Sequence, residues 1–164
     1  MGTAFVALRA AVYATAFLLL WGWLAWRANL ADDRLGWIPG GLAGPGVVLM
    51  GIGAALVLAS IATFVVRGRG TPAPFDAPRM FVASGPYRWV RNPMYIGAFL
   101  LLAGYALYAR SVGVLMVALA LLVAAHLFAL LYEEPTLKRR FGASYEAYAS
   151  RTRRWLPGRP DRAA

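Results

Sequence analysis

Two adjacent carboxylates, Glu133 and Glu134, are the least expected chemical feature of the sequence, because the chain holds only seven acidic residues. They follow a long apolar stretch and come directly before Pro135, a residue that kinks or ends a helix. Carboxylates among interfacial arginines are commonly structural, so one interpretation is that the pair binds the Arg-rich segments on either side. The other interpretation is that one carboxylate holds the ammonium group of a cationic cofactor.

His126 is the only histidine of the chain and lies seven residues before Glu133. A regular α-helix would place both residues on one face, with Leu130 between them. An ionisable side chain within an apolar segment is a functional candidate by default. Two interpretations remain open: a general base that works near neutral pH, or a side chain that only hydrogen-bonds across helices.

A third group of interest lies where an apolar helix is expected to begin. Asn is a preferred N-cap and Pro a preferred first helical residue, so Asn92-Pro93 predicts a helix start. The free N–H groups of such a start suit a carboxylate. The preceding connector, residues 67–92, is rich in Gly and Pro, which favours an ordered loop over a helix.

The elements that position these residues are long and apolar. The chain has 164 residues, 60% of them hydrophobic, with a mean hydropathy of +0.57. Because about twenty apolar residues cross a bilayer, we predict spans over residues 5–26 and 47–66. Residues 94–132 are predicted to form a tight hairpin with its turn at 110–113. Its two helices are the third and fourth spans, and the third is short. The sequence thus predicts an all-α, polytopic integral membrane protein with about four transmembrane helices.

Small residues recur along the second predicted span. Gly51, Ala55 and Ala59 are spaced four apart, which puts a small-residue strip on one face for close helix packing.

The C-terminal segment changes its pattern. Apolar and aromatic residues recur at spacings of four, four and three, while basic residues lie off that stripe, as in an amphipathic helix at the membrane interface. The stripe consists of Leu137, Phe141, Tyr145 and Tyr148. We expect one membrane domain over residues 1–164, in which 1–78 hold two spans and a connector, 79–157 the chemical core, and 158–164 a disordered tail.

The charges are lopsided, with 17 Lys and Arg against seven acids. They cluster between apolar stretches, a pattern that excludes a nucleic-acid binder. Only Arg27, Arg34 and Arg110 fall on one side of the predicted topology, so the positive-inside rule places both termini in the cytoplasm, and we expect a bacterial cytoplasmic membrane. The chain has no cysteine, which excludes thiolate chemistry, and with one histidine we expect no metal site.

Two sequence blocks carry a resemblance to a known family. Residues 84–97 read SGPYRWVRNPMYIG, and they are followed by Glu133-Glu134-x-x-Leu137 and Phe141-Gly142-x-x-Tyr145-x-x-Tyr148. Over residues 79–157 the chain resembles the isoprenylcysteine carboxyl methyltransferase and phospholipid methyltransferase superfamily. The resemblance implies a membrane enzyme that uses S-adenosylmethionine.

The resemblance also implies which residues contact that cofactor. They are Val82, Tyr87, Asn92, Pro93, Met94, Tyr95, Glu133 and Glu134, with Glu133 holding the amino acid part. Two positions depart from the family pattern: Asn92 stands where His is usual, and Ala129 stands where prenylcysteine-specific members have Arg. A carboxylate acceptor would therefore need Arg91 or Arg88, and we expect Arg91 and His126 to act in catalysis.

The expected reaction is methyl transfer to a lipophilic or lipid acceptor in the membrane. Carboxyl O-methylation is the leading hypothesis, ahead of N-methylation of a phospholipid and S-methylation of a thiol. A carboxylate needs no general base, whereas an amine or thiol must first lose a proton. Two alternatives come from other classes: a membrane reductase that uses NADPH, and a non-catalytic membrane protein.

Overall fold

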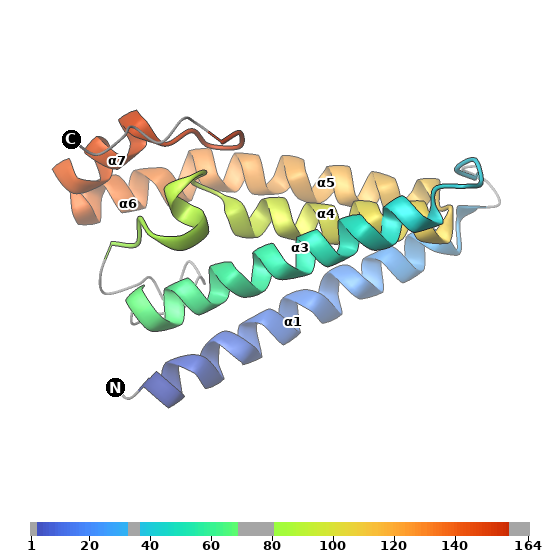
Figure 1. Ribbon diagram of the computed structural model, residues 1–164, viewed down its shortest axis with the longest axis horizontal. Coiled ribbons are helices and arrows are strands. Elements are labelled where there is room, and N and C mark those ends of the chain that lie inside the picture. The colour runs from blue at the N-terminus through green and yellow to red at the C-terminus, as the bar shows by residue number, and fades with distance from the viewer. Residues whose placement is uncertain (1–2, 33–36, 69–80, 158–164) are drawn as a thin grey trace.

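The computed structural model describes residues 3–32, 37–68 and 81–157, and nearly all regular structure within these ranges is helical (Figure 1). Helix α4 contacts both α3 and α5, and α1 contacts α5. These four apolar helices are α1 (Thr3–Asn29), α3 (Ala43–Thr63), α4 (Pro93–Ala109) and α5 (Val112–Phe128). They lie lengthwise in one bundle, so that connections and polar segments gather at its two ends (Figure 1).

Three helical stretches are long and apolar enough to cross a membrane, namely Phe5–Asn29, Ala43–Gly68 and Val112–Phe141. Helix α4 is a shorter apolar helix of 17 residues. Length and composition thus confirm the all-α membrane architecture for three spans, and the third predicted span is short, as expected. Leu19 and Leu58 are 69% and 66% exposed, as befits side chains that face lipid.

The turn between α4 and α5 forms where the sequence predicts it. Arg110 adopts the left-handed conformation, with φ of 56°. Ser111 accepts a hydrogen bond from the Val114 amide at 2.9 Å, and the buried Asp32 accepts one from the Gly113 amide at 2.8 Å. Amides at a helix start have no partner within the helix, so these two side chains cap α5 and close the hairpin.

Helices α3 and α4 approach each other closely at two pairs of glycines. A Cβ atom on Gly46 would lie 2.6 Å from the carbonyl oxygen of Gly104, and a Cβ on Gly53 would lie 2.6 Å from that of Gly97. Any larger side chain would therefore force the backbones apart. The two glycine pairs fix the position of α4, whose first turn belongs to the candidate site.

The prediction that the small-residue strip of the second span packs against another helix is wrong. Gly51, Ala55 and Ala59 are exposed, and nothing lies within 4 Å of a Cβ built on Gly51. The packing face of α3 instead carries Gly46 and Gly53, which are spaced seven apart. A helix that is apolar all round gives no periodic signal for its packing face, so the partner helix decides which glycines are buried.

The helix that starts at α5 does not end at Pro135. It passes through the π-helical segment η4 (Ala129–Glu133) and continues as α6 (Glu134–Phe141). Proline lacks the N–H that an α-helical turn needs, and a π-turn changes the hydrogen-bond register locally, so Pro135 fits at the start of the new segment.

The same π-turn alters the faces predicted for the site residues. Leu130, expected on one face with His126 and Glu133, is 42% exposed, whereas Ala129 is fully buried. The regular spacing of an α-helix is interrupted between the two polar residues, so the simple seven-residue argument does not hold there.

The C-terminal segment forms two short helices instead of the single amphipathic helix that was predicted. Helix α6 ends at Gly142, which has a positive φ of 50°, and α7 (Ala143–Arg151) follows. Glycine adopts this backbone conformation without a steric penalty, so it permits the sharp change of direction.

The aromatic stripe of this segment packs on protein, which corrects the expectation that it lies against lipid. The ring of Phe81 has its centroid 5.4 Å from that of Phe141, 6.0 Å from Tyr145 and 5.1 Å from Tyr148. Tyr145 is only 5% exposed. The stripe therefore anchors α6 and α7 to the loop that precedes α4.

The start of α1 and the α6–α7 segment lie at the same end of the bundle, and the α4–α5 turn lies at the other (Figure 1). This arrangement agrees with an even number of crossings between the two termini. Arg34, the predicted boundary at residue 78 and the predicted tail 158–164 lie outside the described residues, as does most of the Gly- and Pro-rich part of the connector.

Candidate functional site

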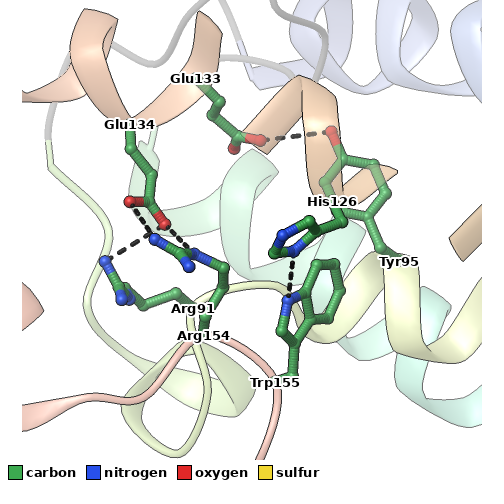
Figure 2. A network of polar contacts seen from close by, with 7 residues as sticks. All are labelled: Arg91, Tyr95, His126, Glu133, Glu134, Arg154 and Trp155. Atoms are coloured by element: carbon green, nitrogen blue, oxygen red, sulfur yellow. Dashed lines mark hydrogen bonds and ion pairs between the residues drawn. The ribbon is translucent and has the colours of Figure 1, made fainter. Parts of the chain in front are cut away.

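Polar side chains converge at the end of the bundle where α4 begins and the α5–η4–α6 helix leaves it. The loop before α4 contributes the short 3-10 helix η3 (Gly85–Arg88). A second segment, residues 152–157, follows α7, and we call it the C-terminal strap. Figure 2 shows seven side chains from α4, the long helix, the loop and the strap in one network.

Glu133 faces the first turn of α4. The Tyr95 hydroxyl donates a hydrogen bond to Glu133 Oε2 at 3.2 Å (Figure 2). Tyr87, 7% exposed, lies close enough for the Glu133 charge to act on its hydroxyl. Burial, with a smaller contribution from Glu133, raises the pKa of Tyr87 well above its ordinary value. Both the sequence and the structure thus group Tyr87, Tyr95 and Glu133, and Tyr87 is a neutral phenol.

Glu134 faces the opposite way, toward two arginines. Arg154 donates to its two carboxylate oxygens at 2.7 and 2.9 Å, and Arg91 lies 3.2 Å from Oε1 (Figure 2). A two-pronged arginine–carboxylate contact fixes both partners in orientation. The hydrogen bond to Glu134 also raises the pKa of Arg154. The interpretation that the acidic pair binds Arg-rich segments is therefore confirmed for Glu134.

His126 is bonded to the strap. The Trp155 indole N–H donates to His126 Nδ1 at 3.0 Å, and the ring centroids lie 5.9 Å apart (Figure 2). The carboxylate of Glu134 lies within electrostatic reach of the same imidazole. The interpretation that His126 hydrogen-bonds to another part of the protein is therefore correct. Its partner, however, lies in the strap and not on a neighbouring helix.

Three buried polar atoms around the start of α4 have no hydrogen-bond partner within the described residues. They are Arg91 Nε, Asn92 Nδ2 and the Tyr145 hydroxyl. Asn92 occupies the N-cap position before Pro93, as predicted, yet its side chain does not cap the helix. Buried polar groups are normally paired, so unsatisfied polar atoms gathered at one place mark a candidate position for a bound ligand or an ordered water.

The remaining predicted residues lie in the loop before α4 and in its first turn. Val82, in the loop, and Pro93, the first residue of α4, are buried, and Met94 is half-buried. Arg88, the second candidate for an acceptor carboxylate, instead stacks on the exposed ring of Trp89, with its guanidinium carbon 5.0 Å from the ring centroid. Asn92, Pro93, Met94 and Tyr95 thus lie together at the start of α4, whereas Arg88 contacts Trp89.

Sequence reasoning missed two residues that the structure brings into the network, Arg154 and Trp155. Both lie in a segment without helical periodicity, so neither pattern nor propensity pointed to them. It also missed Ser60 of α3, a buried residue whose side chain lies against Tyr87. The only available signal was composition: a tryptophan stands directly after two arginines, just before Pro157, where the predicted core ends.

Arg154→Gln is expected to lower the free energy of unfolding by about 1–2 kcal/mol, because Glu134 would keep only its contact with Arg91. Thermal unfolding of the detergent-solubilised protein measures this loss. Arg151→Gln, at an exposed position on α7, is the matched control and should leave stability unchanged. An equal effect of both variants would show that the Glu134 contact has no special weight.

The described residues thus combine helices of membrane-crossing length with a polar, incompletely paired cluster at one end of the bundle, an architecture typical of an integral membrane protein. A sequence model of the family described as phospholipid methyltransferase matches residues 43–144, well over half of the chain. The chain therefore belongs to the phospholipid methyltransferase family. A search among curated proteins found no match.

The match covers α3, the loop before α4, α4 itself and the continuous α5–η4–α6 helix, and it ends at the start of α7. It thus begins well before residue 79, where the sequence resemblance was thought to start, and it leaves out α1 and the strap. Enzymes of this family are S-adenosylmethionine-dependent methyltransferases, so the expected enzyme class and cofactor are confirmed. Nothing in the family supports the reductase or the non-catalytic alternative.

Proposed function

We propose that this protein transfers a methyl group from S-adenosylmethionine to the carboxylate of a lipophilic acceptor at the cytoplasmic face of the membrane. The observation that carries the site assignment is the group of unpaired buried donors at the start of α4, opposite a carboxylate. Family membership supports the cofactor and a lipophilic acceptor.

The described residues fit the amino acid part of the cofactor. Arg91 Nε and Asn92 Nδ2 are buried donors without partners in the part of the chain that the structure describes, and the α4 start beside them adds helix N–H groups, so this side suits a carboxylate. Glu133 uses one oxygen for Tyr95, and its negative charge suits an ammonium group. Tyr87 and Tyr95 offer aromatic faces for a cationic sulfonium. When bound, the cofactor supplies an electrophilic methyl group.

The acceptor is inferred from the state of the basic groups. In-line methyl transfer needs alignment and exclusion of water more than it needs proton shuttling. Within the described site, Glu134 is paired with two arginines and the His126 Nδ1 lone pair is used by Trp155. An amine or thiol would need a free base, which among these groups only Glu133 could supply, and Glu133 is assigned here to the cofactor ammonium; a carboxylate is already ionised at neutral pH. This favours O-methylation.

Phospholipid N-methylation is the second candidate, because the matching family model carries that description. It would require a base for the headgroup amine, and Glu133 is the one site carboxylate that no arginine pairs with among the described residues.

The orientation in the membrane is common to both candidates. Arg91 and the basic residues of α6 lie at the site end, and Arg27 and Arg110 lie toward the other, so the positive-inside rule supports a cytoplasmic position for the site.

The test measures binding and the chemistry of the product. Purified protein should bind S-adenosylhomocysteine in a calorimetric titration, and with labelled S-adenosylmethionine and a membrane lipid extract it should label an acceptor. Alkali releases the label as methanol from a methyl ester but not from an N-methyl group. Alkali-stable label would exclude a methyl ester and leave an amine or a thiol as the acceptor, and absence of binding would overturn the cofactor site.

A further inference from the structure

Three consecutive strap residues bond to three different elements of the site. The Arg153 carbonyl accepts a hydrogen bond from the Arg91 amide at 2.9 Å. The Arg154 guanidinium donates to the Glu134 carboxylate, and the Trp155 indole N–H donates to His126 Nδ1. The strap lies beyond the segment matched by the family, residues 43–144. It therefore joins the start of α4, the start of α6 and the end of α5 by contacts that the family assignment does not explain.

The Trp155 contact defines the protonation pattern of the histidine. An indole N–H can only donate a hydrogen bond, so His126 Nδ1 must present a lone pair to it. A neutral imidazole then carries its proton on Nε2. A proton on Nδ1 and the bond from Trp155 exclude each other, so His126 cannot act as a base through Nδ1 while the strap is in place.

Two groups lie against His126, one from the strap and one from α6. Trp155 packs along the ring at a centroid distance of 5.9 Å, and Glu134 acts on it from α6. The charge of Glu134 is already balanced by Arg91 from the α4 start and Arg154 from the strap. Figure 2 shows the imidazole between Trp155 and the two glutamates, with its second nitrogen bonded to none of the residues drawn.

We propose that Trp155 is a positioning residue that holds His126 as the Nε2–H tautomer, so that His126 donates a hydrogen bond to an ionised oxygen of the methyl acceptor. This inference rests on the proposed function and deepens it, because it assigns the acceptor to the class of lipophilic carboxylates. An oxygen that accepts from Nε2–H needs no proton removed before it attacks, and an ammonium headgroup would find a donor where it needs an acceptor.

The single histidine makes the tautomer directly observable. In protein labelled with ¹⁵N-histidine, the two ring nitrogens of His126 give resonances that distinguish Nε2–H, Nδ1–H and the doubly protonated form. We expect Nε2–H in the wild type at neutral pH, without cofactor or acceptor. An Nδ1–H or doubly protonated ring in the wild type would overturn the inference without any variant.

Trp155→Phe removes the N–H donor and keeps an aromatic ring. It should produce a mixture of tautomers and lower kcat by about 10-fold or more, as loss of an orienting partner does elsewhere, while the Kd for S-adenosylhomocysteine stays within about 2-fold. Trp26→Phe, on an exposed position of α1, is the control and should change neither. An unchanged tautomer in Trp155→Phe would contradict the assignment.

The tautomer measurement separates this inference from the function on which it rests. If the wild type shows the Nε2–H ring but binds no S-adenosylhomocysteine, the proposed function fails and the role of Trp155 in holding the ring stands. If the protein binds the cofactor product and the label in the acceptor is alkali-stable, the carboxylate class is overturned.

Discussion

Glu133→Gln is expected to weaken binding of S-adenosylhomocysteine by at least about 30-fold. Removing one partner of a desolvated charge pair costs about 2 kcal/mol or more, and that energy corresponds to this change in Kd. Glutamine has nearly the same shape and its carbonyl oxygen can still accept from the Tyr95 hydroxyl at 3.2 Å. The loss would therefore report the missing charge and not a collapsed site. Calorimetric titration of detergent-purified protein measures it.

Glu146→Gln is the matched control for this variant. Glu146 makes an exposed ion pair with Lys138 at 2.8 Å on the outer side of α6 and α7, so the same chemical change occurs away from the site. Its Kd should equal that of the wild type. Equal weakening in both variants, or full binding in Glu133→Gln, would remove Glu133 from the cofactor site.

Glu134→Gln would not be an equivalent probe. Glu134 already has its charge balanced by Arg154 and Arg91, so its loss disturbs the strap and the start of α4 together. The two carboxylates, which the sequence could not tell apart, are thus separated by their partners: one faces tyrosines and the other faces arginines.

The sequence was sufficient for those parts of the fold that local chemistry decides. Apolar length predicted the bundle, Asn92-Pro93 marked the start of α4, and Arg110 to Gly113 marked the hairpin turn. Each of these depends on a few neighbouring residues whose backbone preferences are strong. The π-turn before Pro135 was missed because the residues of Ala129–Glu133 fit an α-helix and a π-helix equally well.

The sequence predicted which residues lie in the candidate site better than it predicted which of them contact each other. Tyr95 and Glu133 were assigned to one site and lie in hydrogen-bond contact. Trp155 was missed because its contact with His126 joins segments 29 residues apart through the fold of α6 and α7, and no spacing rule records such a contact. The departure from the amphipathic prediction has the same origin, since the ring of Phe81 gives the aromatic stripe a protein partner.

Gly53→Val is expected to destabilise the protein by about 1–3 kcal/mol and to weaken cofactor binding as well, because its side chain would meet the backbone of α4. The Cβ alone would lie 2.6 Å from the Gly97 carbonyl oxygen and 2.8 Å from the Leu101 amide nitrogen. Backbone atoms cannot move aside as a flexible side chain can, so α4 must shift as a whole and carry its first turn with it.

Gly51→Val tests the same substitution two residues away on the same helix. A Cβ at Gly51 meets nothing within 4 Å, so this variant should keep both its Tm and its Kd for S-adenosylhomocysteine. Thermal unfolding and calorimetry on the pair then report whether the α3–α4 contact positions the site. If Gly53→Val lost stability but bound S-adenosylhomocysteine with an unchanged Kd, the first turn of α4 would be held by the loop and strap and not by the glycine contact.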